Sequence, residues 1–166
     1  PGLYGVIGIL AALNSRNQTG VGCYIDIGML DGLVAIMENA VMRYWATGEV
    51  PKAIGSRHPV ITPFAPYPTS DGHVVIAIVN NEGQLRRLCQ EVLDLPELLE
   101  RPEFATNDLR NQHVQELTKL IGARTSTRTT ADWFAALQAK DIPCATVNTV
   151  ADVFKDPQVV ARGMLK

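Results

Sequence analysis

Residues 47–64, TGEVPKAIGSRHPVITPF, are the feature of the sequence that most constrains the fold. The segment has neither helical nor strand periodicity, and it holds three of the ten prolines of the chain. Because a strongly apolar helical pattern precedes it and a strand–helix pattern follows it, we expect an ordered loop between rigid elements. Binding and catalytic groups often collect in such loops, and Gly55, Arg57 and His58 lie close together here. The alternative is a plain connection between two halves, with His58 in solvent.

Three elements are predicted before this loop. Apolar residues occupy nearly every side of a helix over Gly2–Leu13, and a helix of that kind is buried. The alternating pattern of Val21–Ile27 predicts a strand. Apolar residues at i, i+3, i+4 and i+7 predict one long helix over Gly28–Ala46, in which Met29 is best explained as a packing residue.

After the loop, Asp71-Gly72 between two apolar runs predicts a β-hairpin of residues 65–69 and 73–79. Further patterns predict helices over 80–93, over 108–123 with Asn107 as N-cap and over 131–140 with Thr129 or Thr130 as cap, then a short strand over 144–147 and a last helical turn capped by Thr149. The sequence therefore predicts a mixed α/β (α+β) fold that is rich in helices and has a small sheet.

The composition excludes several classes of protein. Hydrophobic residues make up 46% of the 166 residues, which is enough for a substantial core and argues against disorder. The net charge of −2 without a basic run gives no reason to expect a nucleic acid partner, and the longest apolar run is too short to span a membrane. Cys23, Cys89 and Cys144 are expected to be buried thiols of a reducing, cytoplasmic compartment rather than disulfide partners or zinc ligands. The start at Pro1, in mid-pattern and without methionine, indicates a piece of a longer protein.

No nucleophile–base pair, dinucleotide-binding glycine pattern or phosphate loop can be read from the spacing of the residues. Arg57-His58 is suited to an anionic ligand, because the guanidinium group pairs well with phosphate and carboxylate. Asn80-Asn81-Glu82 follow a predicted strand and open a helix, a favourable place for polar groups to meet a ligand. The simpler explanation of these three residues is a helix N-cap.

Several stretches together resemble the class III (CaiB/BaiF-type) acyl-CoA transferases over essentially the whole chain. PGLYGVIGILAALNSRNQTGVG resembles the glycine–aliphatic helix of that family and the turn after it. YIDIGMLDGLVAIMENA resembles its D-x-x-M-x-D segment, carried here by Asp26, Met29 and Asp31. The set is completed by the GSRHP…PF…DG…NE…RLC run of residues 55–89 and by the later PEFATN…R and IPC…N…DPQ…RGM signatures.

This resemblance implies a fragment of a two-domain enzyme with a Rossmann-like domain and a small domain. Residues 1–27 would be the tail of the large CoA-binding domain, and residues 28–166 would be a long linking helix and the small α/β domain. The resemblance also implies an interlocked homodimer.

The activity implied by the resemblance is transfer of coenzyme A from an acyl-CoA donor to a small carboxylic acid, with coenzyme A as substrate and with no permanently bound cofactor or metal. An aspartate carboxylate attacks the thioester, forming a mixed anhydride and then an aspartyl-CoA thioester. That aspartate is expected about three residues upstream of Pro1. Asp26 and Asp31 do not match it, so no catalytic residue is assigned to this chain, and the chain alone is expected to be inactive.

The family's loop that closes over the active site corresponds to residues 55–64, although Arg57, His58 and Pro59 replace the glycine run found in some members. The candidate residues for binding substrate or CoA are Gly55, Arg57, His58, Met29, Asn81 and Glu82. Two alternatives stay open. The family includes α-methylacyl-CoA racemases, which carry a glutamate near the position of Glu82, and the chain could instead be a non-catalytic domain that binds acyl-CoA or a partner.

Overall fold

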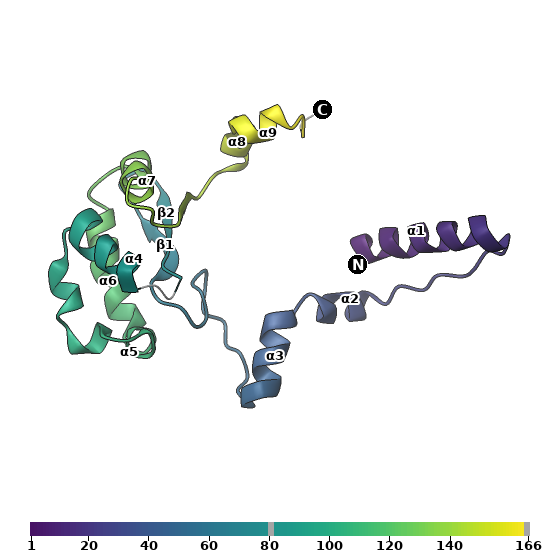
Figure 1. Cartoon of the computed structure of the whole chain (residues 1–166), viewed down its shortest axis with the longest axis horizontal. Coiled ribbons are helices and arrows are strands. Elements are labelled where there is room, and N and C mark those ends of the chain that lie inside the picture. The colour runs from purple at the N-terminus through teal and green to yellow at the C-terminus, as the bar shows by residue number, and fades with distance from the viewer. Residues whose placement is uncertain (80–81, 165–166) are drawn as a thin grey trace. The chain divides into compact units, whose positions relative to one another are not determined.

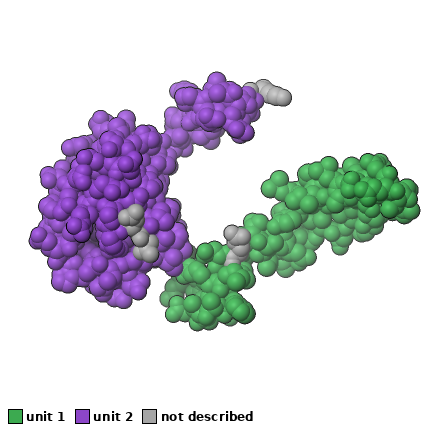
Figure 2. Space-filling model, viewed as in Figure 1, with its two compact units in different colours: residues 1–53 green, residues 54–166 purple. Residues whose placement is uncertain are grey.

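The computed structural model describes residues 1–79 and 82–164, except for the side chain of residue 38. The chain divides into two compact units, Pro1–Ala53 and Ile54–Lys166 (Figure 2). Each unit is described by itself below.

The first unit begins with helix α1, Gly2–Thr19, which ends where Gly20 adopts the left-handed conformation at φ 75°. As predicted, this segment is helical and apolar on all sides. None of its residues is buried within this chain, however, and Leu3 keeps 81% of its surface exposed. The prediction of a buried helix is therefore wrong for this unit taken alone, because its other described residues contact α1 only in places and bury none of its side chains.

The segment after α1 runs back along that helix (Figure 1). A methyl group built on Gly8 would lie 3.3 Å from Ile25 Cγ2 and 3.4 Å from Ile27 Cδ1. The predicted strand over Val21–Ile27 is not formed. The stretch from Gly22 to Gly28 is not helical either, so the chain between α1 and α2 has no regular secondary structure. The alternating pattern identifies a chain that can be extended, but a strand also needs a neighbouring strand to bind its peptide groups, and the described residues of this unit supply none.

The predicted long helix over Gly28–Ala46 is two helices, α2 over Met29–Ala35 and α3 over Glu38–Thr47. At Ile36 and Met37 the backbone has ψ angles of −5° and 10°, and the Met37 N–H donates to Val34 O, three residues back. This tightened turn changes the direction of the helix without a glycine or proline, so the apolar spacing alone could not predict the break.

The second unit is built on a three-stranded antiparallel sheet with the order β1-β2-β3. The predicted hairpin is confirmed: β1, Phe64–Pro68, pairs with β2, His73–Ala77, and Tyr67 lies opposite Val74. The predicted last strand is β3, Cys144–Thr146, on the other side of β2. Alternate residues of β1 and β2 are buried, as expected for a sheet covered on one face.

Helices cover that face of the sheet (Figure 1), and the buried cluster includes Trp133, whose Nε1 donates to Thr125 O at 2.6 Å. The helical elements of this unit before β3 are α4 Glu82–Arg87, a π-helical turn η1 Leu88–Val92, 3₁₀ turns η2 Pro96–Leu99 and η3 Pro102–Phe104, α5 Asn107–Gln112, α6 Val114–Thr125 and α7 Thr130–Gln138. Two short helices, α8 Val150–Val153 and α9 Pro157–Ala161, follow β3 and bury none of their residues.

Three details of these helices differ from the prediction. The expected helix over 80–93 changes from α to π geometry, with Leu93 N donating to Leu88 O five residues back. The expected helix over 108–123 is interrupted at His113, which has φ −103°. Its N-cap is Thr106 rather than Asn107. Thr129 and Thr149 are N-caps as predicted.

Candidate functional site

The loop before β1 folds back on itself and fixes His58 at its centre. The His58 backbone N–H donates to Phe64 O at 2.8 Å, and the imidazole stacks on the Phe64 ring with centroids 5.1 Å apart. Gly55 opens the loop at φ 72°, a left-handed conformation that glycine adopts without strain. The two predicted residues Arg57 and His58 are half-buried in it.

The His58 ring is oriented by peptide groups of its own loop. Its Nδ1 accepts hydrogen bonds from Val60 N at 3.2 Å and from Ile61 N at 3.0 Å. An atom that accepts two N–H groups carries no proton, so the neutral ring has its proton on Nε2. The imidazole is thus prepared to donate one hydrogen bond from Nε2 to an oxygen of a ligand.

Arg57 is held more loosely than His58. Its Nη1 donates to His58 O at 3.2 Å. The guanidinium group has five N–H donors in a planar fork, and this bond uses one of them. Arg57 can therefore bind a carboxylate or phosphate oxygen while its backbone contact is kept.

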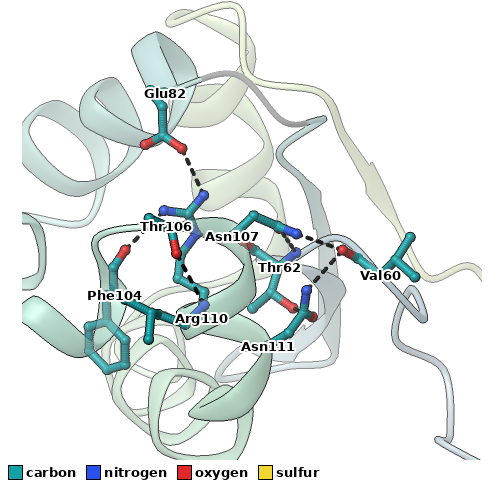
Figure 3. Close-up of polar contacts among 9 residues, drawn as sticks. Val60, Thr62, Glu82, Phe104, Thr106, Asn107, Arg110 and Asn111 are labelled. Carbon is teal, nitrogen blue, oxygen red and sulfur yellow. Dashed lines mark hydrogen bonds and ion pairs between the residues drawn. The ribbon is translucent and has the colours of Figure 1, made fainter.

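One face of α5 holds the middle of the same loop, as Figure 3 shows. Asn107 and Asn111 each donate from Nδ2 to Val60 O at 2.8 Å. Asn107 Oδ1 accepts from Thr62 N at 3.1 Å, and Asn111 Oδ1 accepts from Thr62 Oγ1 at 2.6 Å. Arg110, on the same face, donates from Nε to Thr62 O at 2.9 Å. We call Asn107, Arg110 and Asn111 the loop clamp.

Glu82 is joined to the loop clamp by an ion pair. Arg110 Nη2 lies 2.8 Å from Glu82 Oε1, and Nη1 donates to Phe104 O at 2.9 Å. The Arg110 side chain is 2% exposed, whereas the Glu82 side chain is 62% exposed. The buried cation is thus balanced by a carboxylate whose other parts face solvent, and Glu82 is connected through Arg110 to Thr62 (Figure 3).

The structure thus connects three of the predicted site residues, Arg57, His58 and Glu82, through contacts within one unit. Gly55 belongs to the same loop. Asn81 lies outside the described residues. Met29 is 71% exposed at the start of α2 in the first unit, so its role as a packing residue is not seen within this chain.

Sequence reasoning missed the loop clamp. Asn107 was expected to cap a helix, but Thr106 takes that place by accepting from Leu109 N at 3.3 Å, which leaves the Asn107 amide for the loop. The spacing of the clamp, at i, i+3 and i+4, places its three side chains on one helix face. A polar set with this spacing directly after PEFAT was the available signal.

In the first unit, the start of α1 lies against the start of α2. A methyl group built on Gly32 would lie 3.6 Å from Pro1 Cα and 3.3 Å from Tyr4 Cδ2. Gly32 is buried, the one such position among the residues of this unit whose burial the structure describes. An open cavity of about 310 Å³ adjoins this contact, and Asp26 and Asp31 are among the residues that line it.

The three thiols differ in burial. Burial raises the pKa of the Cys89 thiol to about 12, and it also raises the pKa of Cys144. The expectation of three buried thiols holds for Cys89 alone: Cys144 is half-buried, and Cys23 is exposed in the extended segment after α1, which the other described elements of its unit do not cover. Over residues 1–79 and 82–164, no group of three or more His, Cys, Asp or Glu side chains is placed to hold a metal ion. In the same part of the chain, the helices are too short or too polar to cross a membrane.

Comparison with known proteins gives consistent matches. The family model described as CoA-transferase family III matches residues 1–166. The succinate–glutarate CoA-transferase of Agrobacterium fabrum is 36% identical over 163 residues, which cover 98% of this chain and 40% of that protein. The acetyl-CoA:oxalate CoA-transferase of Acetobacter aceti is 34% identical, with 99% of this chain and 42% of that protein covered.

A solved structure, the CAIB/BAIF family protein from Brucella suis, superposes with a TM-score of 0.86 at 41% identity. The match covers 98% of this chain and 43% of that one. The chain therefore spans about two fifths of the length of these relatives.

Proposed function

This chain belongs to CoA-transferase family III, and from that premise we propose that the protein containing it transfers coenzyme A from an acyl-CoA donor to a small carboxylic acid. The observation that carries the proposal is the match along all 166 residues, together with relatives that are named as CoA-transferases. In this proposal coenzyme A is a substrate, and no cofactor or metal is bound permanently.

The proposed reaction proceeds through a carboxylate upstream of Pro1. The aspartate attacks the thioester carbonyl of the donor and expels the CoA thiolate, which gives a mixed anhydride. The thiolate then attacks the aspartyl carbonyl and releases the donor acid, leaving an aspartyl-CoA thioester. The acceptor acid repeats these two steps in reverse and leaves as the new acyl-CoA, so the aspartate is regenerated.

The Arg57–His58 loop would supply hydrogen bonds to the oxygens that gain negative charge in these steps. Nε2–H of His58 is a fixed donor because Nδ1 is occupied by two peptide groups. Donors placed in advance stabilise such charge most effectively. Arg57 would bind the acceptor carboxylate. The relatives from Agrobacterium fabrum and Acetobacter aceti are named for glutarate and oxalate, which are dicarboxylates, and a guanidinium fork suits the second carboxylate of such an acid.

The remaining candidate residues fit the same proposal. Gly55 adopts the left-handed backbone conformation of the turn that precedes Arg57. Met29 and Asn81 are proposed to contact acyl-CoA. We also propose that residues 1–27 belong to the large domain and residues 28–166 to the linking segment and small domain, and that the enzyme is a cytoplasmic homodimer. Sedimentation of the intact enzyme as a stable monomer at micromolar concentration would contradict the dimer.

A racemase is the second candidate, because Glu82 occupies a position close to the racemase glutamate. The ion pair of Glu82 with the buried Arg110 favours a structural role for this carboxylate. Exchange of the α-proton of a 2-methylacyl-CoA with D₂O, without transfer of CoA, would identify a racemase. The third candidate, a non-catalytic binding domain, predicts neither exchange nor transfer by the intact protein.

The direct test measures CoA exchange between an acyl-CoA and a dicarboxylate with the intact enzyme and its Arg57→Ala and His58→Ala variants. Removing a preorganised donor typically costs about 10²–10³-fold in kcat, so we expect losses of this order. The matched controls are Arg86→Ala and His73→Ala, two exposed residues of the same unit. Wild-type rates in both loop variants would rule out the proposed role of the loop.

A further inference from the structure

Between His58 and β1, the peptide groups of Val60 and Thr62 are bound by side chains of α5. Val60 O accepts from two asparagines, and the N–H, carbonyl and hydroxyl of Thr62 each have one partner in the loop clamp. Thr62 is 3% exposed, so losing one of these partners would leave a buried polar group unsatisfied. A buried polar group without a partner is strongly disfavoured, and the loop conformation therefore depends on the clamp.

The cation of the clamp is itself held in place on three sides. Arg110 is buried, and a buried charge is tolerated only when it is paired and hydrogen-bonded. Its three acceptors are Thr62 O, Phe104 O and Glu82 Oε1. Lysine has three N–H donors on a single nitrogen, so it cannot place donors at the three separate positions that Nε, Nη1 and Nη2 of Arg110 occupy. Glu82 thus fixes the direction of the guanidinium group, and Arg110 fixes the carbonyl of Thr62.

A short chain of contacts connects the clamp to the imidazole. Val60 binds the asparagine amides through its carbonyl and His58 Nδ1 through its N–H. Thr62 follows Ile61, whose N–H is the second donor to Nδ1. A shift of residues 60–62 would therefore turn the His58 ring and change the direction of Nε2–H.

We propose that Asn107, Arg110 and Asn111 are positioning residues that hold His58 in its catalytic orientation, with Glu82 as the anchor of Arg110 rather than a proton carrier. The inference rests on the proposed function of the loop. Misplacing a reacting group by about 1 Å can cost about 10²-fold in rate. A defect in the clamp should therefore lower kcat and leave the KM for acyl-CoA nearly unchanged.

The sharpest variant is Asn111→Asp, which keeps the acceptor for Thr62 Oγ1 and replaces the donor to Val60 O by a carboxylate oxygen. In the intact enzyme we expect kcat to fall about 10–100-fold. The matched control is Asn148→Asp, because the exposed Asn148 likewise accepts from a threonine, Thr146, at 2.7 Å, but lies outside the clamp. Arg110→Lys should show a similar loss of kcat. If Arg110→Lys fails to fold, Thr62→Val is the milder variant, because valine keeps the shape of threonine and removes only the hydroxyl that donates to Asn111.

A double-mutant cycle with His58→Ala separates positioning from general destabilisation. If Asn111 acts through His58, Asn111→Asp should slow the His58→Ala enzyme by less than about 2-fold, because residues that act as one unit are not additive. A purely structural role would instead lower both backgrounds by the same factor. Additive losses, or a wild-type kcat for Asn111→Asp, would overturn the inference while leaving the proposed function intact.

Glu82→Gln tests the role of the anchor, since glutamine keeps an oxygen that can accept from Arg110. We expect CoA transfer to fall by no more than about 10-fold, which corresponds to about 1.4 kcal/mol. A loss as large as that of His58→Ala, accompanied by loss of α-proton exchange, would make Glu82 a proton carrier and overturn its assignment as an anchor. An intact enzyme that performs no CoA exchange at all would overturn the proposed function and this inference together.

Discussion

Asp71 lies in the turn between β1 and β2, the hairpin that directly follows the candidate loop, and its carboxylate connects this turn to the start of α7. Its Oδ1 accepts from Thr130 N at 2.7 Å, from Thr130 Oγ1 at 2.8 Å and from Thr69 Oγ1 at 3.2 Å. These bonds favour the ionised carboxylate, so the backbone bond from Thr130 first, and then the hydroxyl bonds, lower the pKa of Asp71 below its ordinary value of 3.8.

The lowered pKa gives a definite sign to the dependence of stability on pH. The contribution of Asp71 is fully present above the unfolded pKa, near 3.8, and is lost as the pH falls through the lower folded pKa. We therefore expect Asp71→Asn to remove part of the acid destabilisation below about pH 4. Urea unfolding between pH 2.5 and 6 measures this, with the exposed Asp108→Asn as control. Parallel pH curves for wild type and Asp71→Asn would contradict the prediction.

Single residues were predicted well where one local hydrogen bond decides their role. Thr129 and Thr149 are N-caps because a threonine hydroxyl can reach the N–H of the third helical residue. Thr106 and Asn107 are both capping residues by type, and the choice between them depends on Val60 and Thr62, more than 40 positions earlier in the chain. The sequence indicated Arg57 and His58 by type, but not the clamp that orients them.

At the scale of elements, the contact between α1 and α2 depends on the absence of a side chain at Gly32. Ala is favoured over Gly in a helix by about 1 kcal/mol, but a methyl group here would lie 3.3 Å from Tyr4 Cδ2. We expect Gly32→Ala to displace Tyr4 and the start of α1 by a few tenths of an ångström, and with them the carboxylate that we propose upstream of Pro1, which lowers kcat by about 10-fold in the intact enzyme.

The control for this prediction is Gly122→Ala in α6. A methyl group at that buried glycine would lie at an ordinary 3.5 Å from Pro68 Cδ and Cγ, so the same change of residue type should be tolerated there. Thermal unfolding and CoA exchange measured on both variants separate crowding from helix propensity. A Gly32→Ala enzyme with wild-type kcat would show that this contact does not position the nucleophile.

A helix or strand could be predicted from its sequence pattern where the segment that pairs with it belongs to the same chain. The hairpin was predicted because Asp71-Gly72 sets the turn and β1 and β2 follow directly on either side. The break at Ile36–Met37 could not be predicted, because neither residue disfavours a helix strongly. The segment Val21–Ile27 has the alternation of a strand but no strand beside it among the described residues of its unit, and no local pattern reports that.

At the scale of the whole molecule, the sequence predicts that α1 is buried, whereas the structure of this chain leaves its apolar side chains exposed. Leu3, Ile7 and Leu10 have the pattern of a buried helix, yet each keeps more than half of its surface exposed. Burying apolar surface contributes about 25 cal/mol per Å², so we propose that α1 is covered by the rest of the intact protein. The fold class could be predicted from this chain, but the surroundings of its first unit could not.

The last prediction concerns the chain by itself. We expect residues 1–166 to transfer no coenzyme A, because the resemblance places the nucleophilic aspartate upstream of Pro1. Loss of a nucleophile typically lowers kcat by several orders of magnitude, since the remaining groups act only together with it. CoA exchange between an acyl-CoA and a dicarboxylate should be measured for this chain and for the intact enzyme, with hydroxylamine present to trap the aspartyl thioester. Only the intact enzyme should give a trapped aspartate. Turnover by the chain alone, or an adduct at Asp26 or Asp31 beside the cavity of the first unit, would place the nucleophile within the described chain and refute the prediction.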